Sequence, residues 1–118
     1  MPQVQAITKN VRMSAQKVRE VVRQIQGLPA VQAAAVLQVV PRKSARFVAK
    51  TLKSAMANAE DLKEHKEEYR GLNIAGLWIK EAVAGTATTI RRFTPKARGS
   101  AGPILKRNCH IKIVLSDE

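Results

Sequence analysis

Seven basic side chains and no acidic one occupy the stretch from Ala82 to Ser116. They are Arg91, Arg92, Lys96, Arg98, Lys106, Arg107 and Lys112. Guanidinium and ammonium groups form charge-assisted hydrogen bonds with carboxylates and phosphates, so the chemistry that these residues offer is the binding of anions. Because the field keeps one sign over so long a stretch, it needs a polyanion as its counterpart.

The elements that carry these cations are predicted to be two strands joined by a long irregular tip. Apolar and polar residues alternate from Ile104 to Leu115 with β-branched side chains among them, which is typical of a strand. The ladder between the two strands would be interrupted by prolines and glycines, namely Pro95, Gly99, Gly102 and Pro103. A strand continued from Leu77 to Phe93 would be about 55 Å long at about 3.3 Å per residue, more than this chain can bury. The far end must therefore project.

We expect one domain over residues 1–118, with residues 84–107 as a protruding hairpin arm. Two strands without a third are marginally stable in water. Apart from Ile90, Phe93 and a few alanines, the tip has no apolar residue with which to bury itself. The arm is therefore expected to be ordered by what it enters, and a crowded phosphate environment would supply the hydrogen bonds that order it.

The whole chain is basic, and its charge is unevenly distributed. Its 118 residues contain 21 Lys and Arg against 9 Asp and Glu, which gives a formal net charge of +12 and a pI near 10.6. This balance indicates nucleic acid as the first choice of partner and an anionic membrane surface as the second. Five of the nine acidic residues fall between Glu60 and Glu68, and we expect that patch to face away from the partner.

Cys109 is the only cysteine, which excludes a disulfide framework or a cysteine metal site, and it fits a small apolar strand residue. The chain has no run of 18 apolar residues, and its first residues lack the apolar block of a signal peptide. The first nineteen residues hold no acid, which a transit peptide would share, but they are too poor in serine for a typical one. We expect no cofactor, no metal and no membrane, and a location in the reducing cytoplasm, with an organelle that makes its own proteins as the alternative.

Three helices are predicted ahead of the hairpin, after a short strand over Gln3 to Arg12. Ser14 fits the N-cap of the first helix, over Ala15 to Gln26, and Gly27 fits its stop. The resulting class is α+β, with three helices packed on a small antiparallel sheet and one long protruding β-hairpin.

The second helix, over Ala30 to Val40, is apolar nearly all round, so we expect it to be packed by both neighbours. Pro41 ends it and would fall in the first turn of the third helix, over Arg42 to Asp61. Residues up to Gly71 mix charges without periodicity and are predicted to form a loop or a frayed helix end.

Two helical faces extend the basic surface. In a helical projection, Arg12, Arg19 and Arg23 fall within about 40° of one another, beside the apolar stripe of the first helix. On the third helix the cations opposite the apolar stripe are Lys43, Arg46, Lys50 and Lys53. A solvated face is the ordinary explanation of such stripes. In a run from Val21 to Ala59 that holds six basic residues and no acid, we favour contact with phosphates.

Catalysis has no support in the pattern. His65 and His110 stand alone on a loop and a strand, so no convergent metal ligands are expected. A histidine pair could serve a ribonuclease as general base and acid, which is the best enzymatic alternative. A further alternative is an architectural DNA-binding protein of the HU type, which uses a basic β-arm in the minor groove but needs a dimer with paired arms.

Four segments, in order and at matching separations, carry a family resemblance over essentially the whole chain. They are Val11-Arg-Met-Ser-Ala-Gln-Lys-Val-Arg19, Ser54-Ala-Met-Ala-Asn-Ala-Glu60, Arg91-Arg-Phe-Thr-Pro-Lys-Ala-Arg-Gly99 and Leu105-Lys-Arg-Asn-Cys-His-Ile111. Together they resemble large-subunit ribosomal protein twenty-two of bacterial type. The chain departs from the family at Ser100, where many members have an arginine, and so loses one cation expected to contact RNA.

The resemblance implies a non-catalytic structural constituent of the large ribosomal subunit. Its domain would bind large-subunit ribosomal RNA of the 23S type, lie among neighbouring large-subunit ribosomal proteins and support assembly of the subunit. The hairpin would run inward, and its tip would line the nascent peptide exit tunnel and meet the nascent peptide. Carried onto this sequence, the tunnel-facing residues would be Ile90, Arg91, Arg92, Phe93 and Thr94.

The expected RNA-binding residues combine the basic faces with polar positions of the matched segments. They are Arg12, Ser14, Lys17, Arg19, Arg23, Lys43, Arg46, Lys50, Lys53, Asn58, Arg91, Arg92, Lys96, Arg98, Gly99, Lys106, Arg107 and His110.

Overall fold

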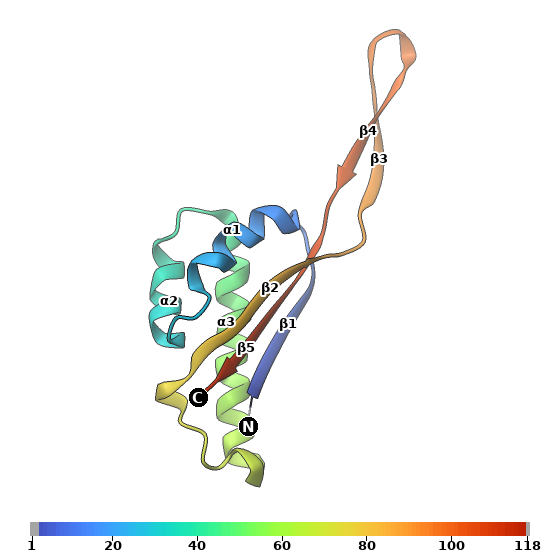
Figure 1. Cartoon of the computed structure of the whole chain (residues 1–118). Helices are drawn as coiled ribbons and strands as arrows, with labels where there is room; N and C mark the ends of the chain where they lie inside the picture. Colours follow the sequence, from blue (N-terminus) through green and yellow to red (C-terminus); the bar gives the residue numbers. More distant parts are fainter. Residues whose placement is uncertain (1–2, 118) are drawn as a thin grey trace.

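The computed structural model describes residues 3–117 and has an α+β architecture with two antiparallel sheets. The elements in chain order are β1 (Gln3–Val11), α1 (Ala15–Ile25), α2 (Ala30–Val39), α3 (Lys43–His65), β2 (Trp78–Thr86), β3 (Ile90–Pro95), β4 (Ala101–Lys106) and β5 (Cys109–Ser116). Helix α3 packs against β1 and β5, α1 packs against β2, and α2 packs mainly against α3 (Figure 1). The predicted fold class is confirmed.

The first sheet has the order β1-β5-β2, so the last strand of the chain is its centre. The side chains of Ile111, Ile113 and Leu115 in β5 are fully buried, as a central strand covered by helices requires. The register of β1 against β5 shifts between Thr8 and Val11, where Asn10 has a φ of 58°. This irregularity turns Val11 inward and explains why Val11 departs from the alternation of its strand.

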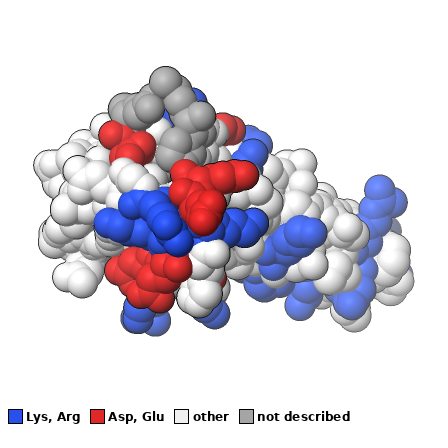
Figure 2. Space-filling model, turned by 90° about the horizontal axis from the view of Figure 1, so that it is seen from below, with Lys and Arg blue, Asp and Glu red and all other residues white. Residues whose placement is uncertain are grey.

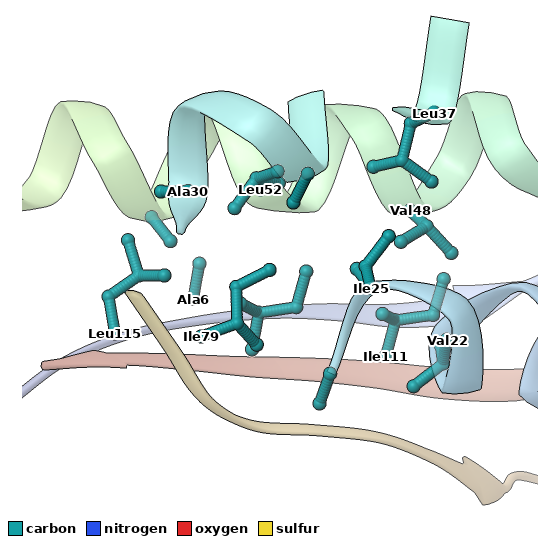
Figure 3. Close-up of a cluster of buried hydrophobic side chains, with 14 of the residues drawn as sticks. Ala6, Val22, Ile25, Ala30, Leu37, Val48, Leu52, Ile79, Ile111 and Leu115 are labelled. Atoms are coloured by element: carbon teal, nitrogen blue, oxygen red, sulfur yellow. The ribbon is translucent and has the colours of Figure 1, made fainter. Parts of the chain in front are cut away.

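The core lies between the sheet and α3, with α1 closing one side. Val48 and Leu52 of α3 face Ile79, Ile111 and Leu115 of the sheet in Figure 3, and none of the five is more than 1% exposed. Such side chains each contribute about 1.5–3 kcal/mol when fully buried. They anchor the strands from which the arm emerges.

Helix α1 begins where the sequence predicts, at Ala15, with Ser14 at the N-cap position. The Ser14 hydroxyl forms no capping hydrogen bond, however, and the first turn holds no acidic residue. The prediction that Arg12 shares a helical face with Arg19 and Arg23 is wrong, because Arg12 precedes the helix. Arg12 lies in the loop between β1 and α1.

Helix α2 is buried on one side and exposed on the other. Ala30, Ala33 and Leu37 are buried, but Val31 is 63% exposed and Val39 is 80% exposed. The helix packs against both α1 and α3, as predicted, but these neighbours leave one side of it uncovered. Its opposite side leaves apolar groups in contact with water.

The start of α3 also differs from its prediction. Arg42 is the N-cap of this helix, so Pro41 lies before the helix and not in its first turn.

Helix α3 runs one turn further than the sequence predicts, to His65. Residues 61–65 were expected in a loop or a frayed end, but they continue the helix. The reason is that Leu62 extends the buried stripe of Ala55 and Ala59 and packs against the core. Two short 3-10 turns, Glu67–Tyr69 and Ile74–Gly76, then lead to β2.

The hairpin is not one continuous ladder. The long strands expected over 77–93 and 104–115 are each interrupted, and β3 pairs with β4 in a separate two-stranded sheet. This sheet is the arm, which projects from the domain in Figure 1 and makes the molecule 67 Å long but only 28 Å and 17 Å across. The predicted projection is confirmed. The prediction that Pro95, Gly102 and Pro103 interrupt the ladder is wrong, because all three are paired within it; the breaks lie instead at residues 87–89 and 107–108.

Truncating a core side chain of α3 should destabilise the domain strongly. We expect Leu52→Ala to lower the free energy of unfolding by about 2–5 kcal/mol, because it removes buried methyl groups and leaves a cavity. The matched control is Val31→Ala on the exposed side of α2, with an expected change within about 0.5 kcal/mol. Urea unfolding followed by circular dichroism measures both, and equal effects would contradict the described core.

Candidate nucleic-acid interface

The arm presents its cations to solvent. Arg91 and Arg92 lie on β3, Lys96 and Arg98 at the turn, and Lys106 at the end of β4, and all five are exposed. The turn closes through a hydrogen bond from the Lys96 amide to the Ser100 carbonyl. Gly99 has a φ of 75°, a backbone region that favours residues without a Cβ. This conformation explains why the matched segment ends in a glycine.

A short joint, made of residues 87–89 and 107–108, connects the arm to the domain and is held by hydrogen bonds. The Asn108 side-chain amide donates to the Thr88 carbonyl at 3.0 Å, and the Ala87 amide donates to the Asn108 carbonyl at 3.1 Å. The Arg12 guanidinium donates to the Arg107 carbonyl at 3.0 Å. Asn108 was not predicted as a functional residue, although asparagine is depleted in strands and favours turns, which is the signal that would have found it.

A pocket of about 440 Å³ lies at the base of the arm. Helices α1 and α3, strand β4 and the segments after β1 and β4 contribute to it. Its lining holds four cations and no carboxylate: Arg12, Lys17, Lys43 and Arg107, with Met13, Ser14 and Leu105. The N-terminus of α1 begins there, and its first amides have no capping side chain. Helix N-termini and cations both favour anions, so the pocket suits a phosphate group.

A second pocket, of about 340 Å³, shares Ser14 and Arg107 with the first. It is also lined by Arg19, Thr86, Thr89 and Asn108, among others. The Arg19 Nε atom donates to the Ala84 carbonyl of β2 at 2.9 Å, so this arginine also secures the strand that leads to the joint. Sequence reasoning found the charge of Arg19 but not this structural contact.

The cation stripe of α3 is arranged as predicted. Lys43, Arg46, Lys50 and Lys53 are all exposed, opposite the buried side of the helix. Arg42 at the helix N-cap pairs at 3.3 Å with Glu20, which is the one acid that precedes Glu60 in the sequence. None of the ion pairs among residues 3–117 involves the four stripe cations.

Three other predicted residues have roles within the fold. The Asn58 side chain donates to the Gln5 carbonyl at 3.1 Å, which joins α3 to β1. The half-buried His110 accepts the Asn10 amide through Nδ1 at 3.1 Å, beside the irregularity in β1. Arg23 is exposed in the last turn of α1, where a cation also interacts favourably with the helix dipole.

The two histidines are not brought together. His110 lies beside the arm joint, whereas His65 ends α3 at the other end of the domain (Figure 1). A hydrogen bond with the Asp61 carbonyl, supported by the Asp61 carboxylate, raises the pKa of His65. Within residues 3–117 no group of three His, Cys, Asp or Glu side chains could hold a metal ion. Cys109 is buried, and burial raises the pKa of its thiol, so it is poorly reactive.

The acidic patch lies at the end of the domain away from the arm. Glu60, Asp61 and Glu64 are in the last turns of α3, and Glu67 and Glu68 follow directly. Figure 2, which views the molecule from below, shows acidic and basic side chains mixed over the domain and only basic ones along the arm. The described helices include none that is both long and apolar enough to cross a membrane.

An α+β domain with a projecting arm that carries cations and no acid defines a protein suited to a polyanion. The family described as ribosomal protein L22p/L17e matches residues 6–116, and the chain belongs to this family. Large ribosomal subunit protein uL22 of Opitutus terrae is 45% identical over 115 residues, covering 98% of this chain and 96% of the relative. The protein of the same name from Akkermansia muciniphila is 42% identical over 116 residues, covering 98% and 97%.

The family settles several predictions. The chain is a structural constituent of the large ribosomal subunit, as the motif resemblance implied, with a ribosomal location in the cytoplasm. The family is structural and non-enzymatic, so the ribonuclease alternative finds no support, and neither does the HU-type alternative.

Alanine variants of Arg19 and Arg23 should separate the contribution of a hydrogen bond to the free energy of unfolding from the contribution of charge alone. Arg19→Ala removes the hydrogen bond to Ala84 and is expected to lower the free energy of unfolding by about 1 kcal/mol. Arg23→Ala removes the same charge from the same helix, where residues 3–117 offer Arg23 no hydrogen bond or ion pair, and its effect should stay within about 0.5 kcal/mol. Urea titrations of the free protein measure both, and an equal loss would show that the Arg19 contact contributes nothing.

Proposed function

We propose that this protein binds large-subunit ribosomal RNA through two basic surfaces and supports assembly of the subunit. One surface is the basic side of α1 and α3, and the other is the arm. The observation that carries the proposal is the pocket at the arm base, where Lys43 of α3 and Arg107 beside the arm line the same acid-free cavity. The two surfaces are therefore continuous at this point.

The mechanism follows from the kind of charge involved. Exposed cations without ion-pair partners are free to neutralise phosphates, so affinity should come mainly from counterion release and fall steeply with salt. Specificity should come from the shape of folded RNA, because two surfaces with a fixed relation can match only certain arrangements of phosphates. No side chain is required to act as acid, base or nucleophile.

The proposal extends to the nascent peptide exit tunnel. The tunnel-facing residues inferred from the resemblance, Ile90 to Thr94, lie on β3, while the turn around Lys96 to Ser100 forms the far end of the arm. A thin two-stranded arm can pass through packed RNA where a globular domain cannot. We propose that this outer part of the arm lines the tunnel and meets the nascent peptide, while the domain contacts neighbouring large-subunit proteins.

The helical cations should control retention in the subunit. We expect a variant with Lys43→Gln, Lys50→Gln and Lys53→Gln to be washed from large subunits at lower salt than the parent. Because three phosphate contacts are lost, retention at moderate salt should fall by at least about tenfold. The measurement is sucrose-gradient sedimentation of lysate with quantitative mass spectrometry of each fraction.

The matched control carries Lys63→Gln, Lys66→Gln and Arg70→Gln. These exposed cations lie near the acidic patch, and the change in net charge is the same. Retention of the control should equal that of the parent. Equal loss from both variants would mean that overall charge decides binding, and failure of the parent chain to sediment with large subunits would refute the proposed function.

Shortening the arm should leave the domain intact. The variant replaces residues 93–103 with Asn-Gly, which keeps the pairs Ile90 with Lys106, Arg91 with Leu105 and Arg92 with Ile104 and supplies a two-residue turn. We expect an unchanged urea midpoint and entry into large subunits, because the core lies entirely in the domain. Cross-linking from a photoreactive nascent chain should be lost, and persistence of that cross-link would count against a tunnel role for residues 93–103.

A further inference from the structure

The arm has two faces of different composition. Paired residues of an antiparallel ladder share a face, and successive residues alternate between faces. One face therefore carries Ile90, Arg92, Thr94, Gly102, Ile104 and Lys106, and the other carries Arg91, Phe93, Pro95, Ala101, Pro103 and Leu105. The second face combines an arginine with an aromatic ring and two prolines.

Phe93 stands out on this second face because it is 75% exposed. The other aromatic residues, Phe47, Tyr69 and Trp78, are partly buried at the domain. Opposite Phe93 in the ladder is Pro103, which is also exposed. A phenylalanine left in water forgoes the favourable free energy of burying its ring, so a partner that covers it gains that free energy.

The other face is already partly covered by the arm itself. The methylene chain of Lys96 lies over Gly102, in the space that a Cβ at this position would occupy. Gly102 is consequently buried, and Thr94 opposite it is only partly exposed. The Phe93 side of the ribbon is thus the side left open for a flat partner.

Charge decides what kind of partner fits. A protein surface that covered Phe93 would have to remove water from Arg91 on the same face, with no acidic residue of the arm to compensate. A nucleobase offers a flat π surface for the ring, and its own phosphate can pair with a nearby guanidinium. Stacking of bases on aromatic side chains is also the usual way in which proteins hold unpaired nucleotides.

We propose that Phe93 stacks on an unpaired nucleobase of the ribosomal RNA and that Arg91, on the same face, pairs with a phosphate beside it. This proposal rests on the proposed RNA binding and adds to it a site for one nucleotide. Phe93 would then contact ribosomal RNA and not the nascent peptide, which differs from the tunnel-facing position inferred from the resemblance.

The first test is photo-cross-linking within assembled large subunits. Phe93 is replaced by p-azidophenylalanine, and the control carries the same residue in place of Ile104, which is exposed on the opposite face. After irradiation, primer extension should stop at one unpaired nucleotide with the first protein and not with the second. Cross-linking of position 93 only to nascent peptide or to protein would overturn the stacking site even if the chain sediments with large subunits.

The second test separates stacking from simple apolar contact. Phe93→Tyr keeps an aromatic ring, whereas Phe93→Leu keeps apolar bulk without one. The 2′-hydroxyl reactivity of the cross-linked nucleotide should rise severalfold with leucine and stay unchanged with tyrosine, because only a ring holds the base by stacking. Equal reactivity in the two variants would overturn the proposal, while Ile104→Ala, on the other face, should leave that nucleotide unaffected.

Discussion

Repulsion among the cations of the arm is the constraint on which the rest of the structure depends. The arm is a two-stranded ribbon without a core, and its cations have no acid within it to oppose them. Such a ribbon is at best marginally stable in water, and its own field works against compaction. Its order therefore has to come from outside, either from the domain at its base or from a polyanion along its length.

The domain orders the arm at its base. Strand β5, which continues the chain from β4, is the centre of the main sheet, and its core-facing side chains are fully buried. The arm thus grows from the most firmly held strand of the molecule. The joint adds hydrogen bonds from Asn108 and Arg12 to backbone carbonyls, so the direction of the arm is fixed by the same residues that line the basic pockets.

Much of this arrangement is predictable from the sequence because apolar periodicity reports burial directly. The limits of α1, the buried stripe of α3 and the projecting arm all follow from it. Other features depend on neighbours that periodicity does not reveal. The exposed valines of α2 depend on how many elements cover that helix, and the extra turn of α3 depends on one contact of Leu62 with the core.

The joint escaped prediction for a related reason. Residues 87–89 are alanine and threonines, which suit a strand as well as a connection, so Asn108 in the opposite segment is the one local sign of the break. The pocket at the arm base likewise unites Arg12, Lys17, Lys43 and Arg107, which are spread over most of the chain. Their charges were predicted to contact RNA one by one, but their convergence on a single cavity is a property of the fold.

This convergence bears on how the arm could enter folded RNA. If the basic side of the domain binds first, the arm is already tethered next to its site, and its own binding becomes an intramolecular event with a high effective concentration. The loss of conformational freedom in the ribbon is then offset by phosphate contacts and by burial of Phe93, and not by the core of the domain. A short joint can fix the direction of the arm only if strand β5, which follows the joint, does not move. The stable domain and the arm that its partner orders therefore have complementary roles.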